Sequence, residues 1–158
     1  MNNIEYEKAV TLYMSSIYKV ALNACRNTAD AEDIVQTTYE KLWKCNKTFT
    51  DFEHMKKWLI RVSINECNSL FRTPWMKKRA AESELEKLSF STPEKSDLYY
   101  ALDNLTQKER EIVHLYYYED YKVGEIADIM HMSESAIQTR LYRARMKLKT
   151  ELEKEGWK

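Results

Sequence analysis

The sequence predicts an all-α protein made of two small helical domains joined by a flexible linker. One observation is the scarcity of turn-forming residues: 158 residues contain two glycines and two prolines, so few positions favour the tight turns of β-hairpins. A second is that apolar residues recur three and four positions apart, as they do along one face of an α-helix. The third is a polar stretch near the middle of the chain that holds both prolines.

The composition also restricts the class of protein. With 44% hydrophobic and 32% charged residues, the chain can bury a core and remain soluble. Its three cysteines form no CxxC pair, and its first residues lack the basic and then apolar layout of a secretory signal. No apolar run approaches the roughly 20 residues that cross a bilayer. We therefore expect a cytoplasmic protein with reduced thiols and no integral membrane segment of its own.

Three helices are predicted in the first half of the chain, over approximately residues 6–26, 30–44 and 53–72. Asp30 is expected to cap the second helix, with Asp33 three positions later as in a capping box. Apolar residues at helical spacing give these helices buried faces. On the second and third helices they are Ile34, Tyr39, Leu42, Trp43, Met55, Trp58, Leu59, Val62, Leu70 and Phe71.

The polar stretch over residues 73–96 begins with basic residues and continues with acidic residues and serines. We expect it to be a linker that holds one weak helical patch at most. Helical patterns resume at residue 97 and continue to the end of the chain. This divides the protein into a first domain at residues 1–72 and a second at residues 97–158.

Two short helical patterns near the end of the chain surround a polar break. The first covers residues 122–130, His131 and Met132 form the break, and Ser133 is expected to cap the next helix. On that last helix we expect an apolar stripe and an opposite polar face. The stripe consists of Ile137, Leu141, Ala144 and Leu148. The polar face consists of Ser135, Gln138, Thr139, Tyr142, Arg143 and Met146, with Arg140 and Arg145 beside it.

The polar face has chemistry suited to the major groove of DNA. Gln and Arg can bond base edges in bidentate fashion, while neighbouring cations contact phosphates. Residues 133–149 carry five cations and one acid, although the whole chain has a net charge of zero. A solvated basic face is the alternative, and a charge run alone would favour it. The paired helices, the small Ala127 where helices can cross and the Ser133 cap favour a DNA-binding helix-turn-helix.

The stretch ALDNLTQKEREIVHLYYYEDYKVGEIADIMHMSESAIQTRLYRARMKLK carries a family pattern. Its matching residues are Leu105, Arg110, Glu111, Ile112, Val113, Glu125, Ile126, Ala127, Ile137, Arg140, Leu141, Arg143, Ala144 and Arg145. The stretch resembles region four of bacterial sigma factors of the extracytoplasmic-function (ECF) group. Thr106 replaces the usual proline, which is expected to loosen the start of that helix slightly. His131 replaces the usual glycine of the turn, where φ is positive, and Ala136 and Gln138 replace a common threonine and lysine.

The first half independently resembles region two of the same family. DAEDIVQTTYEKLWK, residues 30–44, is similar to the helix that binds core polymerase, and WLIRVSINECNSLFR, residues 58–72, is similar to the promoter-opening helix. Ile64 and Ser69 replace the usual basic and acidic residues of that second helix. Region three is missing, as it is in the ECF group. The two matches occur in the family's order and cover most of the chain.

The resemblance implies an RNA polymerase sigma factor of the ECF type, which directs transcription initiation at specific promoters. Its partners would be core RNA polymerase, promoter DNA and an anti-sigma factor, and no cofactor is expected. Minus-thirty-five DNA binding would fall to Ser135, Ala136, Gln138, Thr139, Arg140, Tyr142, Arg143 and Arg145. Minus-ten DNA binding would fall to Phe49, Asp51, Phe52, Asn65, Ser69 and Arg72. Core polymerase binding would fall to Asp33, Gln36, Thr37, Glu40 and Lys44.

Within the minus-ten set, Asn65 and the loop over residues 48–54 match the family's pocket for a base flipped out of the stack. Phe49 and Phe52 offer aromatic faces for single-stranded DNA. Trp58 is expected to belong to the core instead.

No pattern of residues indicates catalysis. The histidines and cysteines lack metal-ligand spacing, and no nucleophile elbow, P-loop or HExxH motif occurs. We therefore do not expect an enzyme. A stand-alone helix-turn-helix regulator is the main alternative, and a helical enzyme or scaffold is a third. The region-two resemblance favours the sigma factor, because a stand-alone regulator has no need of a minus-ten reader.

Overall fold

The computed structural model describes residues 3–72 and 101–154. Within these ranges the chain forms six α-helices and no β-strand, which confirms the predicted fold class. The first half contains α1 (Asn3–Cys25), α2 (Thr28–Lys44) and α3 (Phe52–Phe71). The second half contains α6 (Gln107–Tyr117), α7 (Val123–Met130) and α8 (Glu134–Lys154). The predicted linker at residues 73–96 lies outside the described residues.

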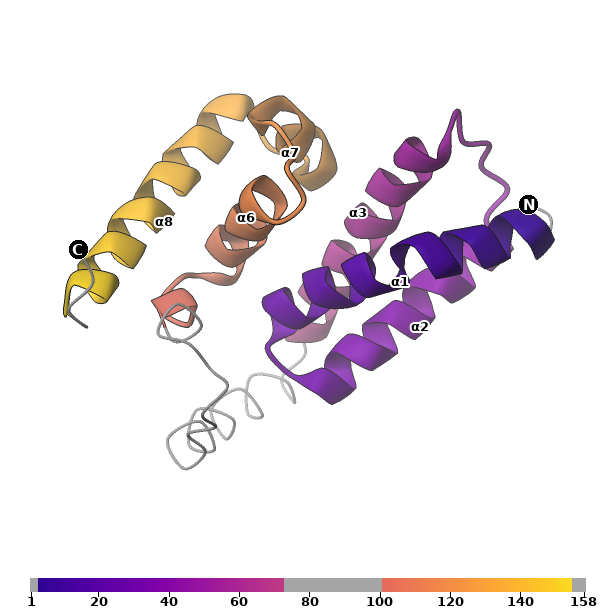
Figure 1. Ribbon diagram of the computed structural model, residues 1–158, viewed down its shortest axis with the longest axis horizontal. Coiled ribbons are helices and arrows are strands. Elements are labelled where there is room, and N and C mark those ends of the chain that lie inside the picture. Colours follow the sequence, from indigo (N-terminus) through magenta and orange to yellow (C-terminus); the bar gives the residue numbers. More distant parts are fainter. Residues whose placement is uncertain (1–2, 73–100, 155–158) are drawn as a thin grey trace.

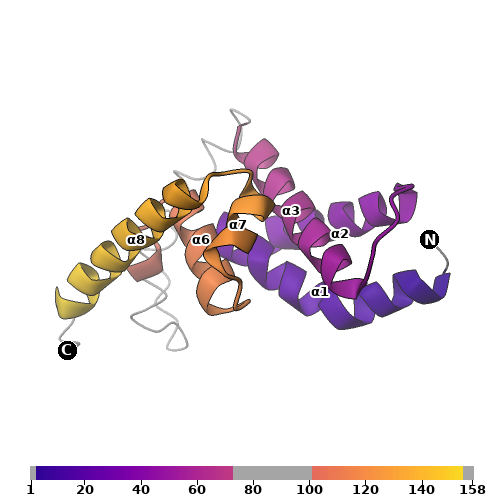
Figure 2. The same ribbon diagram turned by 90° about the horizontal axis from the view of Figure 1, so that it is seen from above.

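The two halves lie against each other. Helices α1, α2 and α3 pack as a three-helix bundle, and α6 and α7 lie between this bundle and α8 (Figure 1). A view from above shows the same order (Figure 2). Contacts cross between the halves from α1 to α6 and from α3 to α7. One buried apolar cluster accordingly runs from Ile17 and Leu59 in the first half to Ile112 and Ile126 in the second.

Helix α2 begins earlier than the sequence predicts. Its N-cap is Asn27, whose side-chain oxygen accepts a hydrogen bond from the backbone N–H of Asp30 at 2.9 Å. Asp30 therefore lies inside the first turn, where it is buried. The prediction that Asp30 caps the helix is wrong, because asparagine is an equally good cap and stands three residues earlier.

Helix α3 begins at a cap that holds the preceding loop. Asp51 accepts a hydrogen bond from the backbone N–H of His54 at 2.7 Å. Trp58 packs against the apolar cluster but stays half-buried, so it forms the edge of the core. Cys25 and Cys67 are buried among alanines and Ile34, which agrees with a packing role for both thiols.

Thr106 caps the N-terminus of α6, which the sequence did not predict. Its hydroxyl accepts a hydrogen bond from the backbone N–H of Glu109 at 3.2 Å, and its own backbone N–H donates to Glu109 Oε1 at 2.9 Å. This reciprocal pair is a capping box. The expected loosening of this helix start is wrong, because threonine supplies both a side-chain acceptor and an N–H that proline lacks.

The helix-turn-helix follows the predicted boundaries closely. His131 ends α7 in the left-handed region, with φ 53°, as the resemblance implied for the turn position. The Ser133 hydroxyl then accepts a hydrogen bond from the backbone N–H of Ala136 at 3.1 Å, which caps α8 as predicted. Glu134 begins the helix directly after this cap.

Candidate nucleic-acid interface

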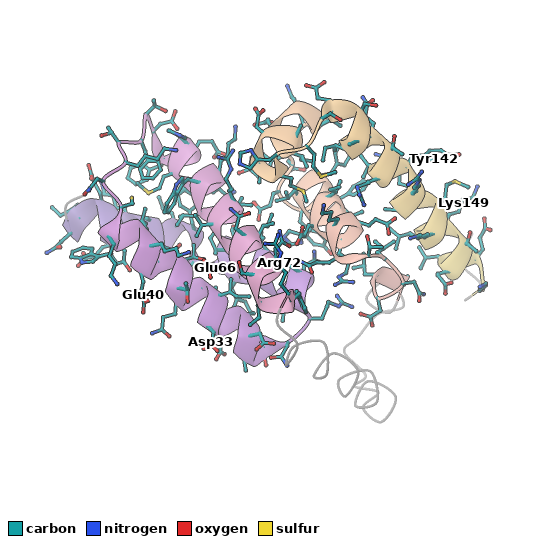
Figure 3. All side chains as sticks on the ribbon, turned by 180° about the vertical axis from the view of Figure 1, so that it is seen from behind. Asp33, Glu40, Glu66, Arg72, Tyr142 and Lys149 are labelled. Atoms are coloured by element: carbon teal, nitrogen blue, oxygen red, sulfur yellow. The ribbon has the colours of Figure 1, made fainter. Side chains whose placement is uncertain are left out.

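Helix α8 separates its side chains into a buried stripe and an exposed face. Ile137, Leu141 and Ala144 are buried where α8 meets α6 and α7, and Leu148 continues the stripe half-buried. The face opposite is exposed, as its helical spacing predicted. It carries Ser135, Gln138, Thr139, Tyr142, Arg143 and Met146. Tyr142 and Lys149 project from the outer side of α8, away from the first half (Figure 3).

Arg145 is exposed but is also tied to α6. Its Nε donates a hydrogen bond to the Tyr117 hydroxyl at 2.7 Å. Its guanidinium lies over the rings of Tyr116 and Tyr117, 5.2 Å and 5.6 Å from their centroids. The sequence gives no signal for this contact, because 28 residues separate Arg145 from Tyr117.

Lys147 also reaches back to α6. Its Nζ lies 2.7 Å from Oε1 of Glu109, the carboxylate that closes the Thr106 capping box. Burial alone raises the pKa of Glu109, but the hydrogen bonds from Lys147 and Thr106 outweigh burial and lower this pKa below its ordinary value. Glu109 is therefore held as an anion between two helices. The capping-box spacing from Thr106 to Glu109 was a usable sequence signal for this residue.

The cations of α8 therefore differ in their availability. Arg145 and Lys147 anchor the helix to α6, whereas Arg143 and Lys149 are exposed on it. Arg140 is half-buried at the edge of the exposed face. The polar face can offer base-edge contacts from Gln138 and Arg143 with cations beside them.

The loop before α3 encloses a pocket of about 320 Å³. Phe49, Asp51 and Phe52 line it together, so the structure brings half of the predicted minus-ten set to one place. The complete lining is Glu5, Lys47, Thr48, Phe49, Thr50, Asp51, Phe52 and Met55. Of these residues, Phe49 also packs edge-on against His54 at 5.3 Å and against Trp58 at 5.6 Å between ring centroids.

The other half of the minus-ten set lies further along α3. Asn65 and Ser69 are one turn apart on its exposed surface, and Arg72 follows at the end of the helix. None of these three residues lines the pocket of the loop. The set is therefore divided into a pocket and an exposed helix surface, a division that spacing along the chain did not predict.

Helix α2 presents the candidate polymerase-binding residues on its outer surface. Asp33, Gln36, Glu40 and Lys44 are exposed, while Thr37 is half-buried. Asp33 and Glu40 lie in the first half, on the other side of the molecule from Tyr142 on α8 (Figure 3).

A groove of about 310 Å³ runs between α2 and α3. It brings Asp33 and Thr37 of the polymerase set beside Ser69 of the minus-ten set. The ion pair between Lys41 and Glu66 bridges the same two helices. Two predicted surfaces therefore meet at this groove.

Over residues 3–72 and 101–154, no group of three or more His, Cys, Asp or Glu side chains could hold a metal ion. In the same ranges no helix is long and apolar enough to cross a membrane. The polar groups identified above suit contacts with phosphates, base edges and protein surfaces.

Two family models match the chain, one in each half. The model for sigma-70 region 2 matches residues 9–75, and the model for sigma-70, region 4 matches residues 95–148. The two matches lie in the order that the sequence predicted. They enclose α2, α3 and all three helices of the second half almost entirely.

Proteins named as RNA polymerase sigma factors are similar to this chain over most of their length. RNA polymerase sigma factor SigV of Bacillus subtilis (strain 168) is 29% identical over 149 residues, covering 92% of this chain and 90% of that protein. ECF RNA polymerase sigma factor SigM of the same strain is 26% identical, covering 87% and 89%. RNA polymerase sigma-E factor of Streptomyces coelicolor is 25% identical, covering 94% and 86%.

Solved structures share the fold. CnrH, in complex with the cytosolic domain of CnrY, matches with a TM-score of 0.70 and 25% identity, covering 96% of this chain and 90% of that one. The sigma factor RpoE, in complex with the anti-sigma factor NepR from Bartonella quintana, matches with a TM-score of 0.67 and 23% identity, covering 94% and 97%. At that identity the second match supports the fold alone.

Proposed function

Since the chain belongs to the ECF group of the sigma-70 family of RNA polymerase sigma factors, we propose that it binds core RNA polymerase and directs transcription initiation at specific promoters. The observation that carries the proposal is the presence of regions two and four in order on one chain, with the polar face of α8 exposed. It acts in the cytoplasm by binding, without catalysing a reaction.

The exposed face of α8 reads the minus-thirty-five element. Gln138 and Arg143 contact base edges, because their side chains can form bidentate hydrogen bonds and both are exposed. Ser135, Thr139 and Tyr142 lie on the same face and help to position α8 on the DNA. The remaining candidates, Ala136, Arg140 and Arg145, lie at its edges.

The loop pocket and the exposed surface of α3 bind the minus-ten element. The pocket is large enough for a nucleobase taken out of the stack, and Phe49 and Phe52 supply aromatic surface at its wall. Asn65, Ser69 and Arg72 follow the strand along the helix. The two parts of the set then have different roles, because the loop pocket binds a base and the residues on α3 contact the DNA backbone.

The outer surface of α2 binds core polymerase through Asp33, Gln36, Thr37, Glu40 and Lys44. These side chains are polar and largely exposed, and such a surface suits a partner that must bind and release. The groove that joins Asp33 and Thr37 to Ser69 supports this assignment, because polymerase and the minus-ten strand would then meet on adjoining surfaces.

An anti-sigma factor holds the chain inactive until its signal arrives. CnrH, similar over 96% of this chain, is found in complex with the cytosolic domain of CnrY. A membrane-tethered partner of that kind would bury surface on both halves of the present chain. Affinity capture from cells in which the target genes are silent should recover such a protein, and recovery of polymerase alone would count against this partner.

Run-off transcription with core polymerase on a promoter library tests the proposed function. The chain should direct initiation at a limited set of promoters that share both elements. A protein that binds a DNA site but gives no transcript with core polymerase would be a stand-alone helix-turn-helix regulator instead.

A further inference from the structure

Two cations of α8 contact α6, one on each side of the buried stripe of α8. Arg145 donates a hydrogen bond from Nε to the Tyr117 hydroxyl at 2.7 Å, and Lys147 Nζ lies 2.7 Å from Oε1 of Glu109. Because each residue turns an α-helix by about 100°, these two side chains project about 160° apart around the axis of α8. The two edges of α8 that border α6 therefore each carry one cation.

The two contacts have opposite effects on the charge of each cation. Glu109 is held as an anion, so its contact cancels the charge of Lys147. Arg145 is held by neutral groups, namely the Tyr117 hydroxyl and the rings of Tyr116 and Tyr117, whose centroids lie 5.2 Å and 5.6 Å from its Cζ. Within the part of the chain that the structure describes, no carboxylate forms an ion pair with Arg145. Those residues therefore fix its position without compensating its charge.

The pair formed by Tyr117 and Arg145 lies at the surface. Tyr117 is the last residue of α6 and is 52% exposed, and Arg145 is exposed as well. The Tyr117 oxygen accepts the hydrogen bond from Nε of Arg145, so its own O–H can donate to another group. The terminal nitrogens of the guanidinium carry further N–H donors. Donors from two helices are therefore gathered at one exposed point beside one positive charge.

This chemistry is suited to a phosphate group. A guanidinium can bond two phosphate oxygens at once, and tyrosine hydroxyls are also among the donors that contact DNA phosphates. The bond from Nε and the stacking on two rings restrict the rotation of Arg145 before any ligand arrives. Less conformational entropy is then lost on binding than for a freely rotating arginine.

Arg145 lies on the same side of α8 as a residue proposed to read bases. Gln138, Tyr142, Arg145 and Lys149 follow one another at helical spacing, so they form one exposed row along α8. Tyr142 and Lys149 of this row project from α8 in Figure 3. Between Gln138 and Arg145 the helix rises by about 10 Å. Since the major groove is about 12 Å wide, a helix whose Gln138 contacts a base edge brings Arg145 to the phosphates at the edge of the groove.

We propose that Tyr117 and Arg145 form a binding site for one phosphate group of the DNA backbone beside the minus-thirty-five element. Arg145 supplies the charge, while Tyr117 positions the guanidinium and donates its own O–H to the same phosphate. The inference rests on the proposed function and deepens it, because it adds a DNA contact from α6, outside the helix-turn-helix. Tyr117 was not among the DNA-binding residues expected from the sequence, since 28 positions separate it from Arg145.

Replacement of single DNA phosphates by neutral methylphosphonates tests the site in the complex of the full chain with core polymerase. A promoter selected by run-off transcription is prepared with one replaced linkage at a time around the minus-thirty-five element, and the affinity of the complex is measured for each. For the wild type, replacement of one particular linkage should lower affinity by about 10-fold, because a charge-assisted contact is lost. With Arg145→Ala, the same replacement should have no further effect.

Tyr117→Phe isolates the hydroxyl, because it keeps the ring beside the guanidinium. Affinity should fall by about 3- to 10-fold for all promoter sequences alike, and the effect of replacing that one linkage should shrink. Tyr118→Phe removes the same hydroxyl from the next residue, which is 65% exposed, and this matched control should equal the wild type. The double variant Tyr117→Phe with Arg145→Ala should bind almost as Arg145→Ala does, because Tyr117 acts together with the guanidinium.

Salt dependence separates a phosphate contact from a contact that only packs α8 on α6. Loss of one phosphate contact should reduce the slope of log affinity against log salt concentration by about 0.9, so Arg145→Ala should show that reduction. Arg145→Lys keeps the charge and should keep the slope, although affinity falls because lysine cannot bond two phosphate oxygens in a fixed fork. If Arg145→Ala lowers helix content by circular dichroism, Arg145→Lys and Tyr117→Phe take its place in the methylphosphonate comparison, where each should weaken the effect of the same linkage.

The outcomes distinguish this site from the proposed function. Promoter binding in which every linkage has the same effect in the wild type and in the Arg145 variants overturns the site, while the proposed function stands. Equal affinities and linkage effects for Tyr117→Phe and Tyr118→Phe overturn the part assigned to Tyr117. A wild-type chain that binds no promoter with core polymerase contradicts the proposed function, and the site falls with it.

Discussion

Arg143 and Arg145 lie two positions apart on α8, yet their environments differ. Arg145 is held by the Tyr117 hydroxyl and two aromatic rings, whereas Arg143 is exposed on the polar face. Spacing predicted the face on which each residue lies, but only the structure shows that α6 restrains one of them. The assignment of base reading to Arg143 and Gln138 follows from their exposure.

We expect Arg143→Ala to weaken recognition of the minus-thirty-five element by about 1–3 kcal/mol, the usual value of a bidentate base contact. Gln138→Ala should relax sequence preference at one base pair with a smaller loss of total affinity. Transcription from promoters mutated at each position of the element measures both effects. Lys8→Ala removes one exposed cation from the first half and is the charge-matched control. Wild-type transcription and selectivity in both variants would contradict the assigned face.

Glu111, at the boundary between the two halves, should make the free energy of unfolding depend on pH. Burial raises the pKa of its carboxyl group to about 7, although the hydrogen bond from Gln107 and the charges of Arg110 and Lys108 oppose the rise. Its Oε2 has no hydrogen-bond partner within the described residues. From the neighbouring α3, the Cys67 thiol faces it. The folded state therefore binds a proton more tightly than the unfolded chain does.

The free energy of unfolding should consequently carry a contribution that is complete below the ordinary pKa of 4.5 and lost as pH rises through about 7. Glu111→Gln removes the titration, so this variant should become more stable relative to the wild type by roughly 1–3 kcal/mol between pH 4.5 and 8. Urea denaturation at several pH values measures the difference. His114, whose pKa burial lowers, is present in both chains and cancels in the comparison. If the difference in free energy of unfolding between the two chains stays constant with pH, the raised pKa of Glu111 is contradicted.

At the scale of elements, helix ends explain where the sequence-based predictions succeeded and where they did not. The apolar stripe of α8 and the Ser133 cap could be predicted because each depends on residues within one helix. The start of α2 was misplaced because Asn27 and Asp30 are both good caps, and the choice depends on how the chain leaves α1. The division of the minus-ten set between a loop pocket and α3 could not be predicted, because it depends on the path of the loop.

The capping box of α6 should contribute measurably to stability. Thr106→Ala removes the acceptor for the Glu109 N–H and should lower the free energy of unfolding by about 0.5–2 kcal/mol. Thr106→Ser keeps a hydroxyl at the same position and should lose much less. Thermal or urea denaturation followed by circular dichroism compares them. Equal stability of the alanine and serine variants would show that the cap contributes nothing.

The turn between α7 and α8 holds a strained residue. His131 has φ 53°, a conformation that an L-residue with a side chain adopts at a cost of about 1–2 kcal/mol. Glycine removes that cost but adds freedom to the unfolded chain, so His131→Gly should raise stability by about 0.5–1 kcal/mol. The same change at Thr150, inside α8, should instead lower stability, by about 0.3 kcal/mol, because glycine is a poorer helix former than threonine. Destabilisation by His131→Gly would indicate that the imidazole makes a stabilising contact.

At the scale of the whole molecule, the distribution of charge matters more than its sum of zero. Arg143 and Lys149 of α8 are exposed, while Lys56 and Lys57 of α3 pair with Glu119 and Glu125 across the boundary between the halves. Charge counts along the sequence showed that cations gather in residues 133–149 although the net charge of the chain is zero. Which segments would meet depends on tertiary packing between α3 and α7, so the pairing could not be predicted.

A chain of zero net charge, in which Lys56 and Lys57 pair with acids of the second half, should bind DNA weakly by itself. Phosphate contacts give sequence-independent affinity, so a sigma factor that exposed all its cations would be retained by genomic DNA. At physiological salt, screening limits the electrostatic influence of each charged patch to about 8 Å. The acids elsewhere on the chain therefore do not prevent the exposed face of α8 from binding DNA once polymerase positions it. Specific promoter binding should therefore belong to the complex with polymerase.

Gel-shift titration of the full chain against a promoter selected by run-off transcription, with and without core polymerase, tests this account most directly. We expect weak binding with little sequence preference for the free protein, and tight binding that depends on both promoter elements once core polymerase is present. Nanomolar, sequence-specific binding by the free protein would contradict the account and indicate a stand-alone helix-turn-helix regulator.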